Sequence, residues 1–493
     1  MLTDVEQARI RLSKNTDAKK KSQFGQFLTP AGTAAFMAGL FAPAEGTCRL
    51  LDAGAGIGSL AAAFLERWSS GGFRFERVEL DAFEIDHALH GQLARTLSKY
   101  AGTAFSVTLH GDDFIHAAVD ALGGGLFAES IPRYSHAILN PPYKKISSHS
   151  AHRMALRRVG IETVNLYSAF VALALAQAAP GGQIVAIIPR SFCNGPYYRP
   201  FRDFILQHAA IRHMHLFESR SKAFKDDKVL QENIIIRLER GATQDSVTVS
   251  TSTDDTFSDL VTKVHPFDRI VFPDDPERFI HVPTSSEKST IELSPAIRQS
   301  LSDLGIKVST GPVVDFRVKD YLRNMPGPGT VPLLYPGHFT TRGMTWPIEH
   351  LKKPNAIERN ADTEKWLYPR GFYCVVRRFS SKEEKRRIVA SVVDPAAFRD
   401  VPMLGFENHL NVFHENKGGL PEALARGLAV FLNATAVDDS FRCFNGHTQV
   451  NATDLKRMKY PSRAALTRLG EWAMKQREIT QELIDEQLGK VTG

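Results

Sequence analysis

LLDAGAGIGSLAAAF, residues 50–64, combines a short apolar strand, a glycine-dense turn and a run of small residues that favours a helix. Gly54, Gly56 and Gly58 tolerate positive φ angles and let the backbone approach a ligand closely. The helix that follows points its positive end at this turn. Because the spacing after Asp52 differs from the G-x-G-x-x-G dinucleotide fingerprint, it favours a nucleotide-like cofactor without a pyrophosphate. A tight turn without a ligand is the alternative.

Residues 1–240 alternate between short apolar stretches and amphipathic ones. Strands are expected at 49–53, 77–85, 106–112, 136–140, 183–189, 211–217 and 233–239. This alternation predicts an α/β fold with a Rossmann-like, doubly wound and mainly parallel sheet. We expect residues 1–240 to form the domain that binds the cofactor and performs catalysis.

The strand after the glycine turn ends in AFEID, residues 82–86. Glu84 is expected at the carboxyl edge of the sheet beside that turn, where a carboxylate can accept hydrogen bonds from both hydroxyls of an adenosyl ribose. A solvated charge at a strand end is the alternative. Asp86 is expected to cap the next helix.

The chain has the composition of an ordinary globular protein. Its 493 residues exceed what one hydrophobic core usually supports, which predicts two domains. The formal charge of +7 fits a polyanionic partner. No long apolar segment and no secretory signal are apparent, so we expect a cytoplasmic protein without a membrane partner. The four cysteines lack metal-ligand spacing, so neither a disulfide framework nor a metal site is expected.

The composition of the sequence changes after about residue 240. Ser/Thr-rich and Pro-containing pieces predict a connecting segment over 241–300. Residues 301–465 mix short strands with Gly/Pro turns and predict a second, mixed α+β domain. A single helix near 464–488 is expected to close the chain, within a C-terminal segment spanning 466–493.

HAILNPPYKK, residues 136–145, places the tetrapeptide Asn140, Pro141, Pro142 and Tyr143 directly after an apolar strand. Two prolines cannot continue a sheet, so the backbone leaves its edge with Asn140 and the Pro141 carbonyl fixed. An exocyclic amine on an aromatic ring is a poor nucleophile, because its lone pair is delocalised. If these two oxygens accept its protons, the nitrogen becomes pyramidal and can attack a sulfonium methyl. Tyr143 can lie against the face of the base. A turn without chemistry is the alternative.

Taken in this order, the motifs resemble those of the gamma class of adenine-N6 DNA methyltransferases from restriction-modification systems. GQFLTP (25–30) resembles the N-terminal cofactor motif of that class, GDDFI (111–115) its adenine pocket, and NPPY its catalytic motif. The resemblance implies S-adenosyl-L-methionine as cofactor, double-stranded DNA as substrate, and methylation of a flipped adenine. It also implies a cognate restriction endonuclease, encoded separately, as a partner.

The resemblance further implies roles for single residues. Thr29 and Pro30 would hold the methionine part of the cofactor, and Asp52, Gly54, Gly56 and Glu84 would bind its remainder. Asp113 would accept from the adenine amine of the cofactor, and Phe114 would pack on that ring. Asn165 and Tyr167 of NLYSAF (165–170) are further expected contacts. Phe224 matches the aromatic that sandwiches the flipped base opposite Tyr143, with Phe217 as the alternative.

The second domain is expected to recognise the DNA target. Reading DNA needs cations for phosphates and polar side chains for base edges. The stretch 377–387 offers Arg377, Arg378, Lys382, Lys385, Arg386 and Arg387, and the stretch 444–455 offers Asn445, His447 and Gln449. A solvated charged surface and a polar loop are the respective alternatives. Residues 309–317, 333–339 and 444–461 also resemble modification methylases paired with PstI- and BsuBI-type enzymes.

Two other functions stay open. A methyltransferase that acts on protein glutamine or ribosomal RNA would also use NPPY, although the basic C-terminal half and GQFLTP favour DNA. A non-catalytic DNA-binding specificity or regulatory protein is the second alternative, which the intact glycine turn and NPPY oppose. The chemistry requires no metal.

Overall fold

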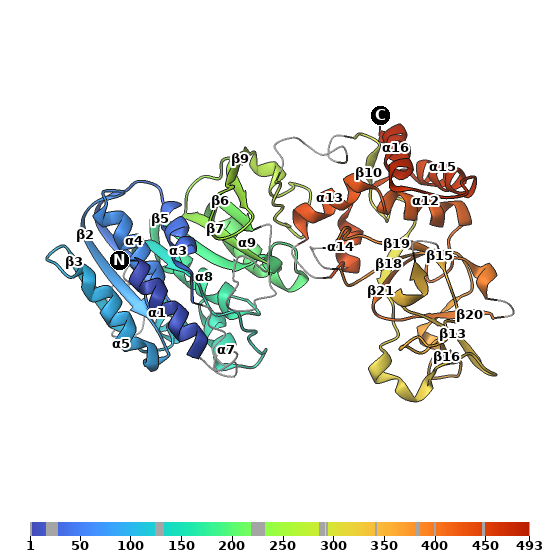
Figure 1. The fold of residues 1–493 in the computed structure, drawn as a ribbon, viewed down its shortest axis with the longest axis horizontal. Coiled ribbons are helices and arrows are strands. Elements are labelled where there is room, and N and C mark those ends of the chain that lie inside the picture. Colours follow the sequence, from blue (N-terminus) through green and yellow to red (C-terminus); the bar gives the residue numbers. More distant parts are fainter. Residues whose placement is uncertain are drawn as a thin grey trace. The chain divides into compact units, whose positions relative to one another are not determined.

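The computed structural model describes residues 2–15, 28–123, 133–217, 232–284, 291, 294–340, 343–380, 384–398, 401–445 and 449–492. The chain divides into two compact units, Met1–Ser286 and Glu287–Gly493, whose elements are labelled in Figure 1. Each unit has hydrophobic clusters of its own.

The first unit is built on a nine-stranded sheet with the order β3-β2-β1-β4-β5-β7-β6-β8-β9. Strands β1 to β5 are mutually parallel, whereas β7 runs antiparallel between β5 and β6. All seven strands expected from the sequence are present, and the doubly wound α/β fold is confirmed. The strands are β1 (Glu45–Ala53), β2 (Arg74–Phe83), β3 (Phe105–His110), β4 (Tyr134–Leu139), β5 (Ala178–Pro189), β6 (Ala209–Phe217), β7 (Asn233–Arg240), β8 (Val247–Ser252) and β9 (Val261–His265).

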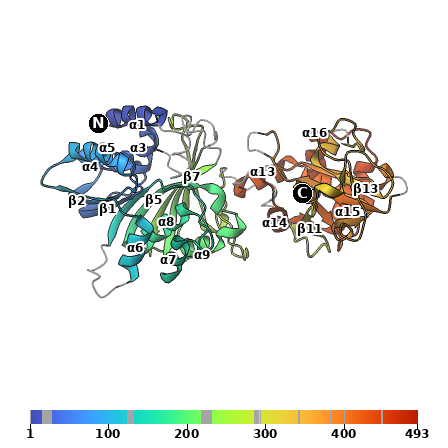
Figure 2. The same cartoon turned by 90° about the horizontal axis from the view of Figure 1, so that it is seen from below.

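Helices cover both faces of this sheet (Figure 2). One face carries α3 (Ala31–Gly39), α4 (Ser59–Ser69) and α5 (His87–Leu97), with α1 (Leu2–Asn15) packed on α3 and α4. The other face carries α6 (Phe114–Gly123), α7 (Ala151–Arg158), α8 (Leu166–Gln177) and α9 (Arg199–His208). Neighbouring strand residues belong to different cores: Leu50 packs with α4, whereas Leu51 packs with α8. The strands are therefore apolar on both faces, as a covered parallel sheet requires.

The winding of the sheet reverses between β1 and β4. Strand β1 pairs with β2 on one side and with β4 on the other. The glycine turn follows β1 and the NPPY tetrapeptide follows β4, so both leave the sheet at neighbouring carboxyl ends. Ligands of open α/β sheets bind at such a switch point.

The segment 241–300 differs from the connecting segment that the sequence predicts. Its strands β8 and β9 extend the sheet, because β8 pairs with β6 and β9 pairs with β8. The hydroxyls of Ser250 and Ser252 are buried and hydrogen-bond the buried ring of His215. The Ser/Thr-rich composition therefore serves internal polar contacts, and the first unit continues to Ser286.

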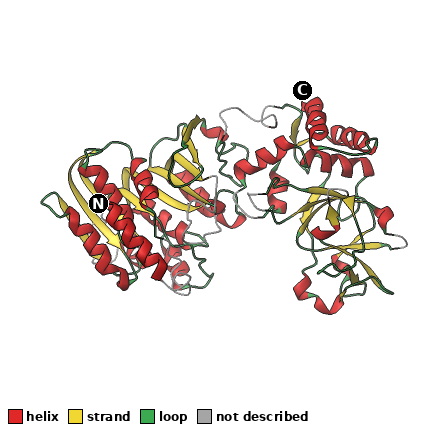
Figure 3. Ribbon diagram, in the orientation of Figure 1, coloured by secondary structure: helices red, strands yellow, loops and turns green. Residues whose placement is uncertain are grey.

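The second unit mixes helices with short strands, which confirms the expected α+β class (Figure 3). Its larger sheets have the orders β12-β16-β13-β20-β17 and β11-β21-β18-β19, and two small sheets pair β10 with β22 and β14 with β15. The strands are β10 (Ile297–Gln299), β11 (Lys307–Thr310), β12 (Leu322–Arg323), β13 (Thr330–Leu334), β14 (Phe339–Thr340), β15 (Gly343–Met344), β16 (Ala356–Glu358), β17 (Leu367–Pro369), β18 (Tyr373–Arg377), β19 (Ala390–Val393), β20 (Met403–Phe406), β21 (Leu410–His414) and β22 (Tyr460–Pro461).

The helices of the second unit include two where the sequence predicts a single C-terminal helix. Its labelled helices are α12 (Glu422–Leu432), α13 (Thr435–Phe444), α14 (Ala452–Arg457), α15 (Arg463–Met474) and α16 (Gln481–Thr492), and the last two replace the predicted single helix. Helices α12 and α15 approach so closely that a Cβ atom at Gly470 would lie 1.6 Å from the Ala423 carbonyl oxygen. Glycine is required at this crossing. Among the described residues, no helix combines the length and the apolar character needed to cross a membrane.

Candidate active site

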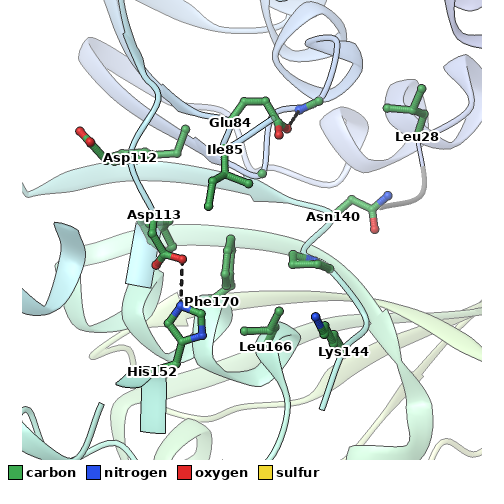
Figure 4. Close-up of a pocket in the computed structure, with 15 residues that line it drawn as sticks. Leu28, Glu84, Ile85, Asp112, Asp113, Asn140, Lys144, His152, Leu166 and Phe170 are labelled. Atoms are coloured by element: carbon green, nitrogen blue, oxygen red, sulfur yellow. Dashed lines mark hydrogen bonds and ion pairs between the residues drawn. The ribbon is translucent and has the colours of Figure 1, made fainter. Parts of the chain in front are cut away.

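A cavity of about 320 Å³ lies at the carboxyl edge of the sheet, where β1, β2 and β4 end (Figure 4). In Figure 4, Asp113 and His152 lie at one end of the cavity and Asn140 and Leu28 at the other. The cavity thus joins the glycine turn to the NPPY tetrapeptide. Seven predicted site residues line it, namely Gly54, Gly56, Glu84, Asp113, Phe114, Asn140 and Pro142.

The glycine turn has the backbone conformation that its sequence predicts. Gly54, Gly56 and Gly58 have φ angles of +80°, +57° and +84°, which residues other than glycine rarely adopt. Asp52 is fully buried behind the turn, and its Oδ2 accepts a hydrogen bond of 3.2 Å from the Ala61 amide in the first turn of α4. Burial raises the pKa of Asp52 to about 7. Asp52 is not among the residues that line the cavity, so in this structure it holds the turn against α4.

Glu84 connects the end of β2 to the glycine turn. Its side chain is buried, Oε2 accepts from the Gly56 amide at 2.8 Å, and Oε1 accepts from the Asp86 amide at 2.7 Å. These bonds fix a carboxylate at the wall of the cavity. Asp86 caps α5 through the Ala88 amide, as expected.

Asp113 caps α6 and also pairs with a histidine. Its Oδ1 accepts from the amides of Ile115 and His116, and its Oδ2 accepts from His152 Nε2 at 2.9 Å. Burial disfavours the charged carboxylate, but the hydrogen bonds and charges of His152 and His116 together outweigh it and lower the pKa of Asp113. The hydrogen bond with Asp113 raises the pKa of His152. The two groups therefore hold each other in their charged forms.

Asp113, His116 and His152 each offer one ligand atom, and these atoms lie within 4.8 Å of one another. Within the described ranges, this set could hold a transition-metal ion, since imidazole and carboxylate are ligands that such ions accept. The Asp113 carboxylate also lines the cavity, so a bound ion and a bound cofactor would share it.

Asn140 follows the last residue of β4 and is oriented from two sides. Its Nδ2 donates to Thr29 Oγ at 2.9 Å, and the Tyr143 hydroxyl donates to its Oδ1 at 3.2 Å. The Tyr143 hydroxyl also lies 3.3 Å from the Ile187 carbonyl oxygen. Burial raises the pKa of Tyr143, which keeps this hydroxyl protonated. The contact with Thr29 joins the NPPY tetrapeptide to the N-terminal motif.

The other residues of the motifs are placed as follows. Thr29 is buried, and the Pro30 carbonyl accepts the first helical hydrogen bond of α3 from Ala34. Pro141 is buried beside the cavity-lining Pro142. Asn165 Nδ2 donates to the Tyr198 hydroxyl, and the buried Tyr167 contacts Ser191. Neither Asn165 nor Tyr167 is among the residues that line the cavity. Phe224 and residues 25–27 lie outside the described residues.

Eight further residues line the cavity that sequence reasoning did not select. Leu28, Phe83, Ile85, Asp112 and Lys144 adjoin motif residues, and this adjacency is the signal that could have identified them. Phe170 lies in the NLYSAF stretch and contacts Phe114 with a ring-centroid distance of 5.0 Å. His152 stands in α7 without any motif around it. The eight are Leu28, Phe83, Ile85, Asp112, Lys144, His152, Leu166 and Phe170.

The basic stretch 377–387 does not form one exposed charged surface. Arg387 is 1% exposed and donates to Ser380 and Asn445. Arg386 donates to Gln481 and to the Ala434 carbonyl.

Other predicted DNA contacts are also divided between interior and surface. Arg377 pairs with Glu384, whereas Lys385 is exposed. Arg378 donates to Gln449, while Asn445 is buried. Lys382 and His447 lie outside the described residues. The DNA contacts of this set stay a prediction.

Known proteins resemble the chain in sequence and in fold. The family model of the Eco57I restriction-modification methylase matches residues 110–224, which include the cavity residues Asp113 and Asn140. The structure of the Type IIL restriction-modification enzyme MmeI in complex with DNA aligns with 99% of this chain and 73% of its own, with a TM-score of 0.51 and 10% sequence identity. At that identity, the likeness concerns the fold.

Two curated relatives span nearly the whole chain. The Type II methyltransferase M.BsuBI of Bacillus subtilis is 54% identical over 483 residues, which cover 97% of this chain and 96% of the relative. The Type II methyltransferase M.PstI of Providencia stuartii is 43% identical over 471 residues, which cover 94% and 92%. With this identity over both units, the chain belongs to the Type II methyltransferases of restriction-modification systems.

Proposed function

We propose that the protein transfers a methyl group from S-adenosyl-L-methionine to the N6 amine of an adenine flipped out of duplex DNA. The observation that carries the proposal is the single cavity lined by the glycine turn, Glu84, Asp113 and Asn140. Membership of the Type II methyltransferases supports methyl transfer and DNA as the substrate.

The groups around the cavity fit this cofactor. Glu84 and Asp113 offer acceptors for ribose hydroxyls and an adenine amine, while Phe114, Phe170 and Ile85 offer apolar surface for a ring. Three carboxylates outnumber the two basic side chains of the lining, Lys144 and His152, which disfavours a polyphosphate. When bound, the cofactor supplies an electrophilic methyl group on a sulfonium. We assign Thr29, Pro30 and the glycine turn to the same binding site.

Asn140 is the residue that acts on the substrate amine. Its Nδ2 is held by Thr29, which sets the orientation of the carboxamide and the position of Oδ1. An amide oxygen can accept two hydrogen bonds, so Tyr143 and a substrate amine can share Oδ1. With the Pro141 carbonyl as the second acceptor, the amine nitrogen loses conjugation and gains nucleophilicity. Tyr143 and Phe224 are proposed to contact the flipped base.

The second unit is proposed to recognise the DNA target. Residues 287–493 contain 30 Lys and Arg against 24 Asp and Glu, whereas residues 1–286 contain 31 against 30. Nearly all of the excess positive charge therefore lies in the second unit, where it supports phosphate binding. We further propose that the protein acts in the cytoplasm beside a separately encoded restriction endonuclease.

The test uses purified protein and cofactor carrying an isotopic label in its methyl group. Duplex DNA, ribosomal RNA and a protein release factor are offered in parallel reactions. The proposal predicts label in DNA and its release as N6-methyl-2′-deoxyadenosine after digestion to nucleosides. Label confined to RNA or protein would overturn it, as would DNA binding by the wild type without any transfer.

A further inference from the structure

Two phenylalanine rings of the second unit lie on its surface beside arginines. The Phe316 side chain is 64% exposed and that of Phe379 is 41% exposed. Arg317 Cζ lies 5.5 Å from the Phe316 ring centroid, and Arg378 Cζ lies 5.8 Å from that of Phe379. Exposed rings that gather with cations and polar side chains are typical of a binding surface, whereas a single exposed ring is not.

The backbone brings the two segments that carry the rings to one turn, residues 407–409. Phe316 belongs to the short 3-10 turn η5 (Asp315–Arg317), which follows Val313, and the Asn408 amide donates to the Val313 carbonyl at 2.9 Å. On the other side, the Arg378 amide donates to the His409 carbonyl at 2.8 Å. The 407–409 turn is therefore hydrogen-bonded to both ring-bearing segments.

His409 joins the rings as a polar member of this surface. Its ring lies 4.8 Å from that of Phe379, and its backbone amide donates to Glu407 Oε2 at 2.9 Å. Its Nδ1 donates to Glu407 Oε1, and the Glu407 side chain is fully buried. Because Nδ1 is used in this way, Nε2 is the ring nitrogen that can contact a partner.

Gln449 and Arg378 complete the surface. Gln449 forms an antiparallel bridge with Phe379, and its Oε1 accepts from Arg378 Nη2 at 3.1 Å. Arg378 Nη1 donates to the Asn408 carbonyl at 3.2 Å. The guanidinium is thus held in place by the turn and by Gln449. We call the six residues Phe316, Arg317, Arg378, Phe379, His409 and Gln449 the aromatic patch.

We propose that the aromatic patch is the surface through which the second unit contacts the base pairs of duplex DNA, an inference that rests on the proposed function. Histidine and glutamine can bond base edges, and phenyl rings can contact thymine methyl groups or wedge against base steps. A surface that bound phosphates alone would gain nothing from two exposed rings. The patch therefore fits a partner that presents apolar and polar groups together within a strong negative field.

Charge favours DNA over a protein as the occupant. The patch carries two guanidinium groups, and its unit carries most of the excess positive charge of the chain. Two carboxylates in the segments that carry the patch are engaged in pairs, since Glu407 bonds His409 and Asp315 pairs with Lys353 at 2.7 Å. Because these two carboxylates are already paired, the guanidinium groups of the patch can attract a polyanion.

The experiment measures DNA affinity of the full chain with Phe316→Ala, Phe379→Ala and the double variant. Met474→Ala is the control, because Met474 is 50% exposed on α15 of the same unit and lies outside the patch. The probe is a fluorescent duplex with the target site that methylome sequencing identifies. We expect the Kd to rise about tenfold for each ring, because each variant removes one aromatic contact with the bases. Cofactor affinity and thermal unfolding should match the wild type.

Salt dependence separates the roles of rings and arginines. The ring variants should weaken binding at every salt concentration without changing the slope of log Kd against log salt. Arg317→Ala should reduce that slope by the amount expected for the loss of about one phosphate contact. The inference is overturned if the double variant binds and methylates DNA like the wild type, or if it loses only a protein partner. Wild-type protein that leaves DNA unmethylated would instead defeat the proposed function itself.

Discussion

The two units differ in how well sequence motifs locate their functional residues in space. In the first unit, motif residues separated by more than a hundred positions, such as Leu28 and Asn140, line one cavity. In the second unit, side chains of one basic stretch lie in different environments, since Arg387 is buried and Lys385 is exposed. A motif at the end of a parallel strand has a position fixed by topology, whereas a run of charge does not. Motif position is therefore a better guide to a site than charge.

The largest expected effect is that of Asn140→Ala in the first unit. Removing the proposed acceptor of the amine protons should lower the methylation rate on the order of 10³-fold, because such preorganised contacts act in the transition state. Binding of cofactor and DNA should persist, which equilibrium titration can check. A variant that turns over at the wild-type rate would remove Asn140 from the mechanism.

Arg387→Ala tests the contrast within the second unit. This change deletes a buried guanidinium that bonds Ser380 and Asn445, so the free energy of unfolding should fall by about 3 kcal/mol. The matched change Lys385→Ala, on an exposed side chain, should stay within about 0.5 kcal/mol. Chemical denaturation measures both. Equal effects of the two changes would contradict the division between interior and surface.

Much of the fold could be predicted because its strands are apolar runs. The strands of 183–189 (QIVAIIP) and 233–239 (NIIIRLE) each hold a run of apolar residues that a sheet covered on both faces can bury. Strand β8 could not be found this way, because its serines are buried by bonding His215, a partner distant in sequence. The break between α15 and α16 also has no Gly or Pro to mark it, since residues 475–480 are KQREIT.

The candidate site could be predicted where a motif residue is also a strand-end residue. Glu84 and Asn140 satisfy this condition, and both line the cavity. Asp52 is a motif residue whose side chain turns to α4, a direction that spacing alone does not give. His152 comes from a helix without a motif, and its pairing with Asp113 is seen only in the folded chain. Long-range polar pairs were therefore the part that the sequence could not reveal.

Glu84→Gln tests the hydrogen bonds at the glycine turn. The amide would place a donor beside the Gly56 or Asp86 amide and would lose the charge that attracts ribose hydroxyls. Cofactor affinity should fall about 30-fold, which calorimetry can measure. Glu79→Gln on the same strand is the control, because that side chain is half-buried, pairs with Arg77 and does not line the cavity. Unchanged affinity in Glu84→Gln would exclude it from the cofactor site.

His152→Gln should have the smallest effect, and the effect should depend on pH. The pKa of His152 is raised, so its contribution to stability is complete below its ordinary value of 6.5 and is lost as pH rises through the raised value. The pKa of Asp113 is lowered from 3.8, so its contribution is lost only as pH falls through that lower value. The unfolding free energies of wild type and variant should therefore differ most between these limits, by less than about 1 kcal/mol for partly exposed groups.

Denaturation of both proteins at about pH 6 and about pH 9 measures this difference. It should be present at the lower pH and nearly absent at the higher one. His116→Gln is the control. The His116 ring lies 5.2 Å from the His152 ring, but it is His152 Nε2 that bonds the Asp113 carboxylate. A difference that grew with pH would show that the pair is not held in its charged form.

The most direct test of the central claim, that the glycine turn and the NPPY tetrapeptide form one site for adenine methylation, is methylome sequencing. Genomic DNA is taken from cells that express the wild type or Asn140→Ala. We expect N6-methyladenine at one short sequence with the wild type and none with the variant. Methylated cytosine in its place, or an unmodified genome in cells that contain the folded wild-type protein, would contradict adenine methylation at this site.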